Sequence, residues 1–69
     1  MTHATEPFSE ALRRARAEFL EMPGLKLTAP QAARLLSVDA ALCDQVLSVL
    51  VETRFLAQTS NRRFVRAGH

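Results

Sequence analysis

The fold is decided by the stretch Leu27–Leu56, which runs LTAPQAARLLSVDAALCDQVLSVLVETRFL. It begins with a capping box, in which Thr28 caps the amide of Gln31 and the Gln31 side chain reaches back to Thr28. Pro30 then falls in the first helical turn, where its missing N–H costs nothing. These signals predict a helix over Ala29–Leu36.

A tight connection and a longer helix follow within the same stretch. Ser37-Val38-Asp39 is a short connection, and Asp39 is suited to cap the next helix. That helix is expected to run to about Thr53, because its apolar residues share one face. The residues of this face are Cys43, Val46, Leu47 and Leu50.

Upstream, Phe8, Leu12, Ala15 and Phe19 recur at spacings of four, three and four, which predicts one face of another helix. Thr5 is its candidate N-cap, and Glu10 is placed to pair with Arg14 at i,i+4. The helix should stop near Met22, because Pro23 disfavours helical dihedrals in the residue before it.

Three short extended segments complete the chain. Leu25–Leu27 alternates and has the length of a single β-bridge. Phe55–Gln58 and Arg63–Arg66 are predicted to be two short strands joined by a turn, in which Asn61 is best suited to a left-handed conformation.

The order is therefore helix, short strand, helix, tight turn, helix and hairpin. This predicts a winged helix-turn-helix, mainly α with a small β-hairpin, as one domain over residues 1–69. Residues 1–6 and 67–69 are expected to be flexible. The alternative is a plain three-helix bundle with a disordered tail.

The amino-acid composition is typical of a small globular protein. The chain has 69 residues, 48% of them hydrophobic and 23% charged, which is an ordinary globular composition. A single cysteine excludes an intramolecular disulfide, and the N-terminus has no apolar run that would indicate a signal peptide. No stretch is long enough to span a membrane, so we expect a soluble cytoplasmic protein without a membrane partner.

Positive charge gathers at the C-terminal end. From Thr53 onward there are four arginines and no acid, whereas the first 52 residues hold five basic and seven acidic groups. This asymmetry favours an anionic partner for the hairpin. The alternative is that charges on an exposed hairpin only deter edge-to-edge aggregation.

The segment LTAPQAARLLSVDAALCDQVLSVLVETRFLAQTSNRRFVRA resembles the winged helix of bacterial MarR-type and IclR-type transcriptional regulators. The resemblance covers about residues 25–67, and the whole chain resembles short stand-alone bacterial winged-helix proteins. It implies that the second helix of the helix-turn-helix enters the major groove of duplex DNA. The implied base-facing positions include Ala41, Asp44, Gln45 and Ser48, and the implied phosphate contacts are Arg62, Arg63 and Arg66.

Two features depart from that pattern. Only Gln45 is a residue type that commonly contacts bases, and Asp44 would face a polyanion. Leu35, Leu42 and Val49 are apolar at positions that are usually polar in such regulators, and an exposed apolar patch generally marks an interface. The second hypothesis is therefore a winged helix used as a protein-interaction or homodimerisation module, with these three residues at the interface.

The sequence offers few residues that could form a metal site or a catalytic site. His3 and His69 lie at the two ends and Cys43 is the only cysteine, so no zinc ligand set and no general base within a predicted element is apparent. Cys43 is expected to be a buried structural residue, since its helical position faces inward and Asp39 and Asp44 would raise its pKa. We expect no enzyme activity, no cofactor and no small-molecule substrate.

Overall fold

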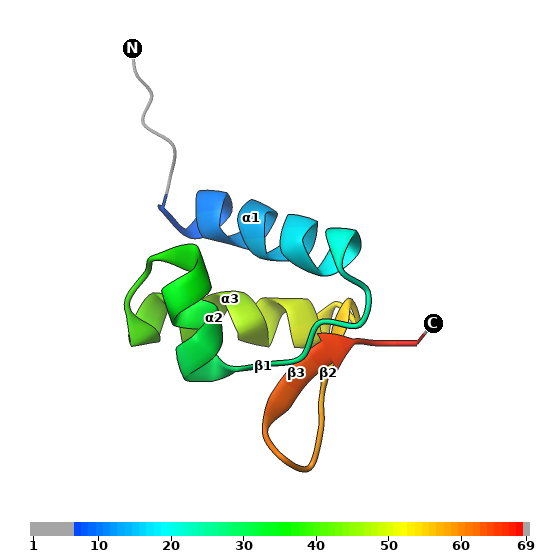
Figure 1. The fold of residues 1–69 in the computed structure, drawn as a ribbon. Helices are drawn as coiled ribbons and strands as arrows, with labels where there is room; N and C mark the ends of the chain where they lie inside the picture. Colours follow the sequence, from blue (N-terminus) through cyan, green and yellow to red (C-terminus); the bar gives the residue numbers. More distant parts are fainter. Residues whose placement is uncertain (1–6, 69) are drawn as a thin grey trace.

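The computed structural model describes residues 7–68 (Figure 1). The candidate cap Thr5 and the two histidines, His3 and His69, lie outside the described residues. The elements, in chain order, are α1 (Pro7–Glu21), β1 (Leu27–Thr28), α2 (Ala29–Leu36), α3 (Ala40–Glu52), β2 (Leu56–Gln58) and β3 (Arg63–Arg66). The fold is mainly helical with a small antiparallel sheet, as the sequence predicts.

Helix α1 buries the predicted face against α3. Ala15 and Phe19 are buried, and Phe8 and Leu12 are half-buried against the core. The expected ion pair between Glu10 and Arg14 is wrong, because Glu10 instead accepts a hydrogen bond from Arg13 at 2.6 Å.

Arg14 reaches across to the end of α2. Its guanidinium donates to the carbonyl oxygens of Leu36 at 3.2 Å and Leu35 at 3.5 Å. The last carbonyls of a helix have no hydrogen-bond partner within the helix, and a cation near them also interacts favourably with the negative end of the helix dipole. Arg14 therefore joins α1 to α2 by capping α2 from outside.

Helix α2 begins as the capping box predicts. Gln31 N–H donates to Thr28 Oγ1 at 3.3 Å, and Thr28 N–H donates to Gln31 Oε1 at 2.9 Å. Pro30 lies in the first turn, and the helix ends at Leu36. Both predicted bounds of α2 are confirmed.

The turn between α2 and α3 is made by a left-handed residue. Ser37 has φ 59° and donates its N–H to Arg34 O, while Val38 N–H donates to Ala33 O at 3.1 Å. This pair of bonds is a Schellman motif, whose left-handed position usually holds glycine. Asp39 then caps α3 by accepting from Leu42 N–H at 2.8 Å, as predicted.

The sheet has three strands in the order β1-β3-β2, both pairs antiparallel. Leu27 lies opposite Phe64 in one pair, and Leu56 lies opposite Arg66 in the other. The short segment before α2 is thus paired with the hairpin, which fixes the hairpin to the helices. Ala67, which the sequence places in a flexible tail, donates its N–H to Phe55 O at 3.0 Å.

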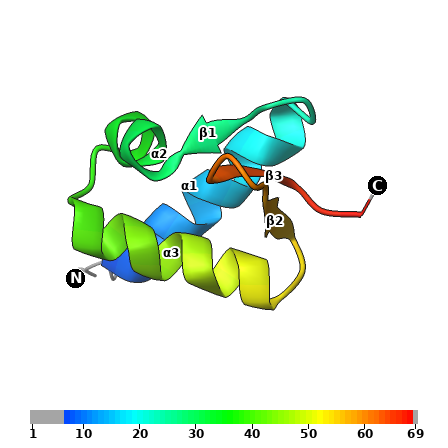
Figure 2. The ribbon, with the colours of Figure 1, turned by 90° about the horizontal axis from the view of Figure 1, so that it is seen from below.

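One core lies between the helices and the sheet (Figure 2). The tip of the β2–β3 hairpin projects from this body, whereas the other end of β3 lies near α1 (Figure 1). Four buried residues come from α3, which is therefore the central element of the core. The buried apolar residues are Ala11, Ala15, Phe19, Ala32, Leu36, Cys43, Val46, Leu47, Leu50, Leu56 and Phe64.

Candidate functional site

The exposed face of α3 holds all four candidate base-facing residues. Ala41, Asp44, Gln45 and Ser48 are exposed, because the opposite side of the helix supplies the core. Glu52 extends this face by one more turn. The face thus contains one amide, one hydroxyl and two carboxylates, and no basic residue.

A groove of about 430 Å³ runs between α3 and the hairpin. Asp44 and Glu52 both line it, and none of its lining residues is a cation. The complete lining is Asp44, Leu47, Ser48, Val51, Glu52, Gln58 and Phe64. This groove presents hydrogen-bond acceptors and negative charge, so it disfavours a phosphate group.

The tip of the hairpin holds Arg62 and Arg63, both exposed. The turn is closed by Thr59 N–H donating to Arg63 O at 2.8 Å and by Arg62 N–H donating to Thr59 O at 3.0 Å. The left-handed residue is Arg62, with φ 64°, so the prediction that Asn61 takes this conformation is wrong. Neither guanidinium pairs with a carboxylate in the described part of the chain.

Arg66 is separated from those two arginines. It lies at the far end of β3, about 10 Å along the strand from Arg63. Its guanidinium carbon lies 4.5 Å from the centre of the Phe55 ring, and its Nε is buried without a hydrogen-bond partner among the described residues. The three predicted phosphate contacts are therefore divided between the tip and the root of the hairpin.

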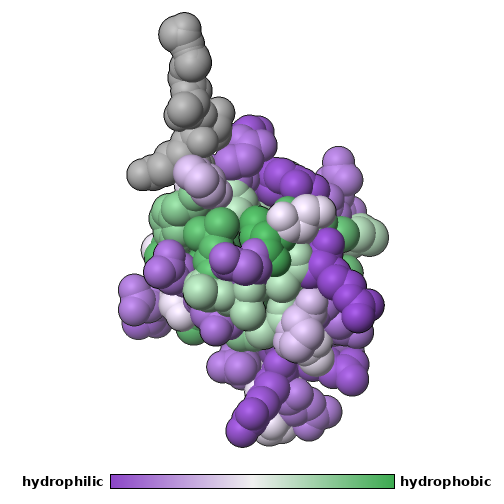
Figure 3. Space-filling model, turned by 90° about the vertical axis from the view of Figure 1, so that its left-hand side faces the viewer, coloured by the Kyte–Doolittle hydropathy of each residue, from purple (hydrophilic) through white to green (hydrophobic). Residues whose placement is uncertain are grey.

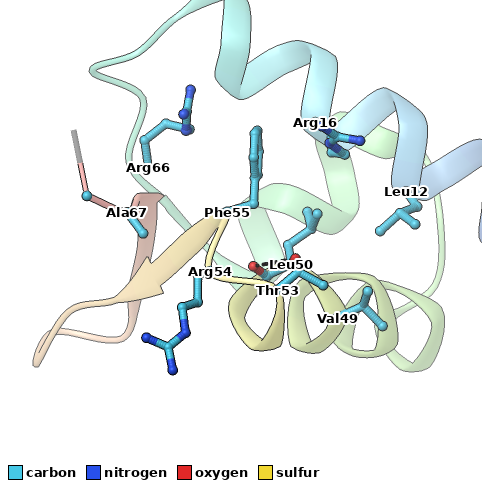
Figure 4. A pocket seen from close by; sticks show the side chains of 10 residues that line it. Leu12, Arg16, Val49, Leu50, Thr53, Arg54, Phe55, Arg66 and Ala67 are labelled. Atoms are coloured by element: carbon cyan, nitrogen blue, oxygen red, sulfur yellow. Dashed lines mark hydrogen bonds between the residues drawn. The ribbon is translucent and has the colours of Figure 1, made fainter.

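Arg16 shares the ring of Phe55 with Arg66. Its guanidinium carbon lies 5.1 Å from the ring centre, and Figure 4 shows the two guanidiniums on either side of the ring. Because this contact joins α1 to the hairpin, no local pattern in the sequence indicated it. Among the arginines of α1, only Arg13 forms an ion pair with a carboxylate of the described residues, and its partner is Glu10.

The three candidate interface residues differ in exposure. Leu35 is 38% exposed, whereas Leu42 and Val49 are half-buried, and Leu42 packs against the core. Leu20 and Met22, at 53% and 47%, are more exposed than any of them and were missed. In the sequence, only their positions outside the apolar face predicted for the first helix indicated that Leu20 and Met22 would be exposed.

Apolar side chains also gather at one end of the molecule. Figure 3 views the end where α1 begins and where α2 turns into α3, and it shows an apolar area bordered by hydrophilic side chains. Phe8 and Leu42 are half-buried at the edge of the core in these elements. The apolar surface is thus divided between this end and the C-terminal end of α1.

Cys43 is buried, as predicted, and its thiol lies 3.6 Å from Ala29 O. Burial raises the pKa of the Cys43 thiol, and the Asp44 carboxylate raises it further. A thiol with a raised pKa is a poor nucleophile at neutral pH. This residue therefore has the chemistry of a core side chain.

No cluster of three His, Cys, Asp or Glu side chains between residues 7 and 68 is arranged to hold a metal ion. None of the three helices over the same range combines the length and apolar character needed to cross a membrane.

Comparisons with protein-family models, with curated proteins and with solved structures gave no match to this chain.

Proposed function

We propose that this chain is a small winged-helix protein that binds duplex DNA, chiefly through phosphate contacts at the tip of the β2–β3 hairpin. The order of its elements and the pairing of β1 with β3 are those expected of a winged helix. The observation that carries the proposal is the projecting hairpin, with Arg62 and Arg63 exposed at its tip (Figure 1). From Thr53 to His69 the sequence has no acid that would oppose them.

Binding of this kind depends little on base sequence. Guanidinium groups donate paired hydrogen bonds to phosphate oxygens, which position a protein on DNA without distinguishing bases. On α3, Gln45 and Ser48 offer limited base contact, and Asp44 is repelled by nearby phosphates. Because one domain of this size has a small footprint, useful affinity requires a homodimer or several copies on one duplex.

The test is fluorescence anisotropy on a random-sequence duplex over a series of salt concentrations. Each phosphate contact contributes about −0.9 to the slope of log K against log salt. Arg62→Ala/Arg63→Ala should therefore make the slope less negative by about 2 and weaken binding to all sequences alike. The matched control is Arg13→Ala/Lys26→Ala, which removes the same charge from exposed positions outside the hairpin.

The control should change the slope by much less than the hairpin variant. Equal effects of the two double variants would mean that net charge, not the hairpin, attracts DNA. No binding by the folded wild-type protein at low salt would refute the proposal.

A second candidate, a protein-interaction module, is favoured by the groove between α3 and the hairpin. Its two carboxylates, Asp44 and Glu52, lie where a winged helix normally meets DNA. Leu20 and Leu35 are exposed apolar residues on other elements. Under this candidate, Leu20→Asp or Leu35→Asp should abolish self-association in sedimentation velocity while the circular dichroism spectrum stays unchanged.

Leu42 is unsuited to that experiment, because it packs against the core and its replacement by Asp would also destabilise the fold. A wild-type protein that remains monomeric at high concentration would exclude the homodimer form of the second candidate.

A further inference from the structure

A pocket of about 510 Å³ lies where α1, the end of α3 and the end of β3 meet (Figure 4). This volume is within the range of small-molecule sites. The pocket is separate from the acidic groove and from the tip of the hairpin. Its lining residues are Leu12, Arg16, Val49, Leu50, Thr53, Arg54, Phe55, Arg66, Ala67 and Gly68.

The lining carries three arginines and no acidic residue. The ion pair between Arg13 and Glu10 is the one salt bridge found over residues 7–68, so no carboxylate there neutralises these arginines. Cations that form no ion pair raise the local concentration of anions. The electrostatics of the pocket therefore select an anionic ligand.

Phe55 holds two of these arginines in place. Arg16 and Arg66 lie on the two faces of its ring, at 5.1 Å and 4.5 Å from the centre. A guanidinium on an aromatic face keeps its N–H edge available, and that planar edge matches the oxygens of a phosphate group. The buried Nε of Arg66 has no acceptor among the described residues, although buried donors are nearly always paired.

Arg54 and Thr53 lie at the rim. Arg54 extends away from the other two arginines in Figure 4, so its charge acts on the pocket from a distance. The Thr53 hydroxyl donates to Leu50 O at 3.3 Å and retains its lone pairs. On the other side Leu12 and Val49 are apolar, so the pocket has a charged end and an apolar end.

We propose that this pocket binds a small phosphorylated molecule, with its phosphoryl group beyond the edge of the Phe55 ring, where one N–H of Arg16 and one of Arg66 reach it from the two sides, and its carbon skeleton against Leu12 and Val49. This site does not depend on the proposed contact between the hairpin tip and DNA. The phosphate chemistry alone is shared with a DNA backbone, and the experiment separates the two sources.

The first measurement is a titration of the full chain with inorganic phosphate and with phenyl phosphate, followed by ¹H–¹⁵N correlation spectra at low ionic strength. Saturable shifts are expected in the amides of residues 53–55 and 66–68, and not in those of residues 59–62. Phenyl phosphate should bind more tightly than phosphate, because its ring contacts the apolar end. Absent or non-saturable shifts, shifts centred on residues 59–62, or equal affinities for the two probes would overturn the proposal.

The second measurement repeats the titration on variants. Arg16→Gln and Arg66→Gln should each weaken phosphate binding roughly tenfold or more, as expected for the loss of a charge-assisted hydrogen bond. Arg13→Gln is the matched control, because it removes the same charge from the same helix but from a residue already paired with Glu10. An equal loss in Arg13→Gln would show that only diffuse charge attracts phosphate.

Arg66→Lys covers the case in which Arg66→Gln fails to fold. It keeps the charge but loses the planar fork, so affinity should remain well below that of the wild type. Wild-type affinity in Arg66→Lys would overturn the assigned recognition by a guanidinium.

The last experiment distinguishes a small phosphorylated ligand from the phosphates of a DNA backbone. Arg16→Gln should leave the affinity for a random duplex unchanged, and saturating phenyl phosphate should not displace the duplex. A matching loss of duplex affinity would assign the pocket to the DNA backbone and overturn the small-molecule proposal. If only Arg62→Ala/Arg63→Ala loses duplex binding, that result tests the hairpin and does not affect the proposal for the pocket.

Discussion

Arg54 occupies a backbone conformation that favours glycine. Its φ is 67°, and it follows the end of α3 in a second Schellman motif. In this motif Phe55 N–H donates to Leu50 O at 2.9 Å, and Arg54 N–H donates to Val51 O at 3.0 Å. We expect Arg54→Gly to stabilise the protein, because a Cβ atom in the left-handed region is crowded by the following carbonyl and glycine has none.

The magnitude follows from two opposing terms. The left-handed conformation costs a residue with a side chain about 1–2 kcal/mol, and the freedom of glycine in the unfolded chain costs about 0.4–1 kcal/mol. The net gain is about 0.5–1 kcal/mol, or a rise of about 2–8 °C in Tm for a domain of this size. Loss of the side chain subtracts little, since Arg54 is exposed and makes no ion pair within the described chain.

The assay is urea unfolding followed by circular dichroism, with Arg54→Ala as the matched variant. Alanine loses the same guanidinium but keeps Cβ, so the difference between the two variants isolates the backbone conformation. Glycine should exceed alanine in the free energy of unfolding by about 0.5–1 kcal/mol. At Ser60, which does not have a positive φ, the order should reverse. An Arg54→Ala variant as stable as Arg54→Gly would refute the reasoning.

Three further predictions concern the core and the caps. Burial raises the pKa of the Cys43 thiol above its ordinary 9.0, so the contribution of this thiol to the free energy of unfolding should be constant below 9.0 and should fall as the pH rises above that value. Urea titrations at several pH values should show this fall in the wild type and not in Cys43→Ala. Leu47→Ala, at a residue 1% exposed, should cost about 2–5 kcal/mol, a large part of the total stability of about 3–10 kcal/mol for this length, and urea unfolding followed by circular dichroism should show the loss as a lower midpoint. Thr28→Ala should lower the midpoint of thermal unfolding through loss of about 1 kcal/mol from the cap, whereas Gln31→Ala, which leaves the Thr28 hydroxyl in place, should lower it less. An unchanged midpoint in Thr28→Ala would show that the capping box contributes nothing to stability.

Most of the helical framework could be predicted because its signals are local. The capping box at Thr28, the Asp39 cap and the apolar spacing of α1 each involve residues within a few positions of one another. The caps form hydrogen bonds between residues three apart in the sequence, and the apolar spacing repeats every three or four residues, so both can be recognised within a short segment. Strand bounds were predicted to within one or two residues for the same reason.

The left-handed positions escaped prediction because none of the three turns that need them contains glycine. Ser37, Arg54 and Arg62 take positive φ, and the turn rules pointed to Asn61 for the third. In each case the surrounding hydrogen bonds outweigh the local cost. The closing bonds of the hairpin, between Thr59 and residues 62 and 63, determine which residue turns.

The arginines were misplaced because long side chains form contacts that depend on tertiary structure. Arg14 caps the end of α2 through the carbonyls of Leu36 and Leu35, 22 and 21 residues away in sequence, and Arg66 stacks on Phe55. The resemblance and the absence of acids after Glu52 grouped Arg66 with Arg62 and Arg63 as phosphate contacts. Arg66 shares one face of β3 with the buried Phe64, because residues two apart in a strand lie on the same face.

The distribution of charge constrains how both proposed ligands could bind. A duplex seated on α3 and the hairpin together would bring its phosphates to the groove that holds Asp44 and Glu52. Both carboxylates belong to α3, so a phosphate held against this face would be repelled, and the repulsion would offset the attraction of Arg62 and Arg63. DNA binding is therefore expected to be led by the hairpin tip, with α3 held off the bases and with low sequence specificity. The Arg16–Phe55–Arg66 pocket is at the other end of β3, so a phosphorylated ligand there would not compete with DNA for the arginines at the hairpin tip. Two elements join the regions: β3 carries Arg63 at one end and Arg66 at the other, and α3 lines both the pocket and the acidic groove.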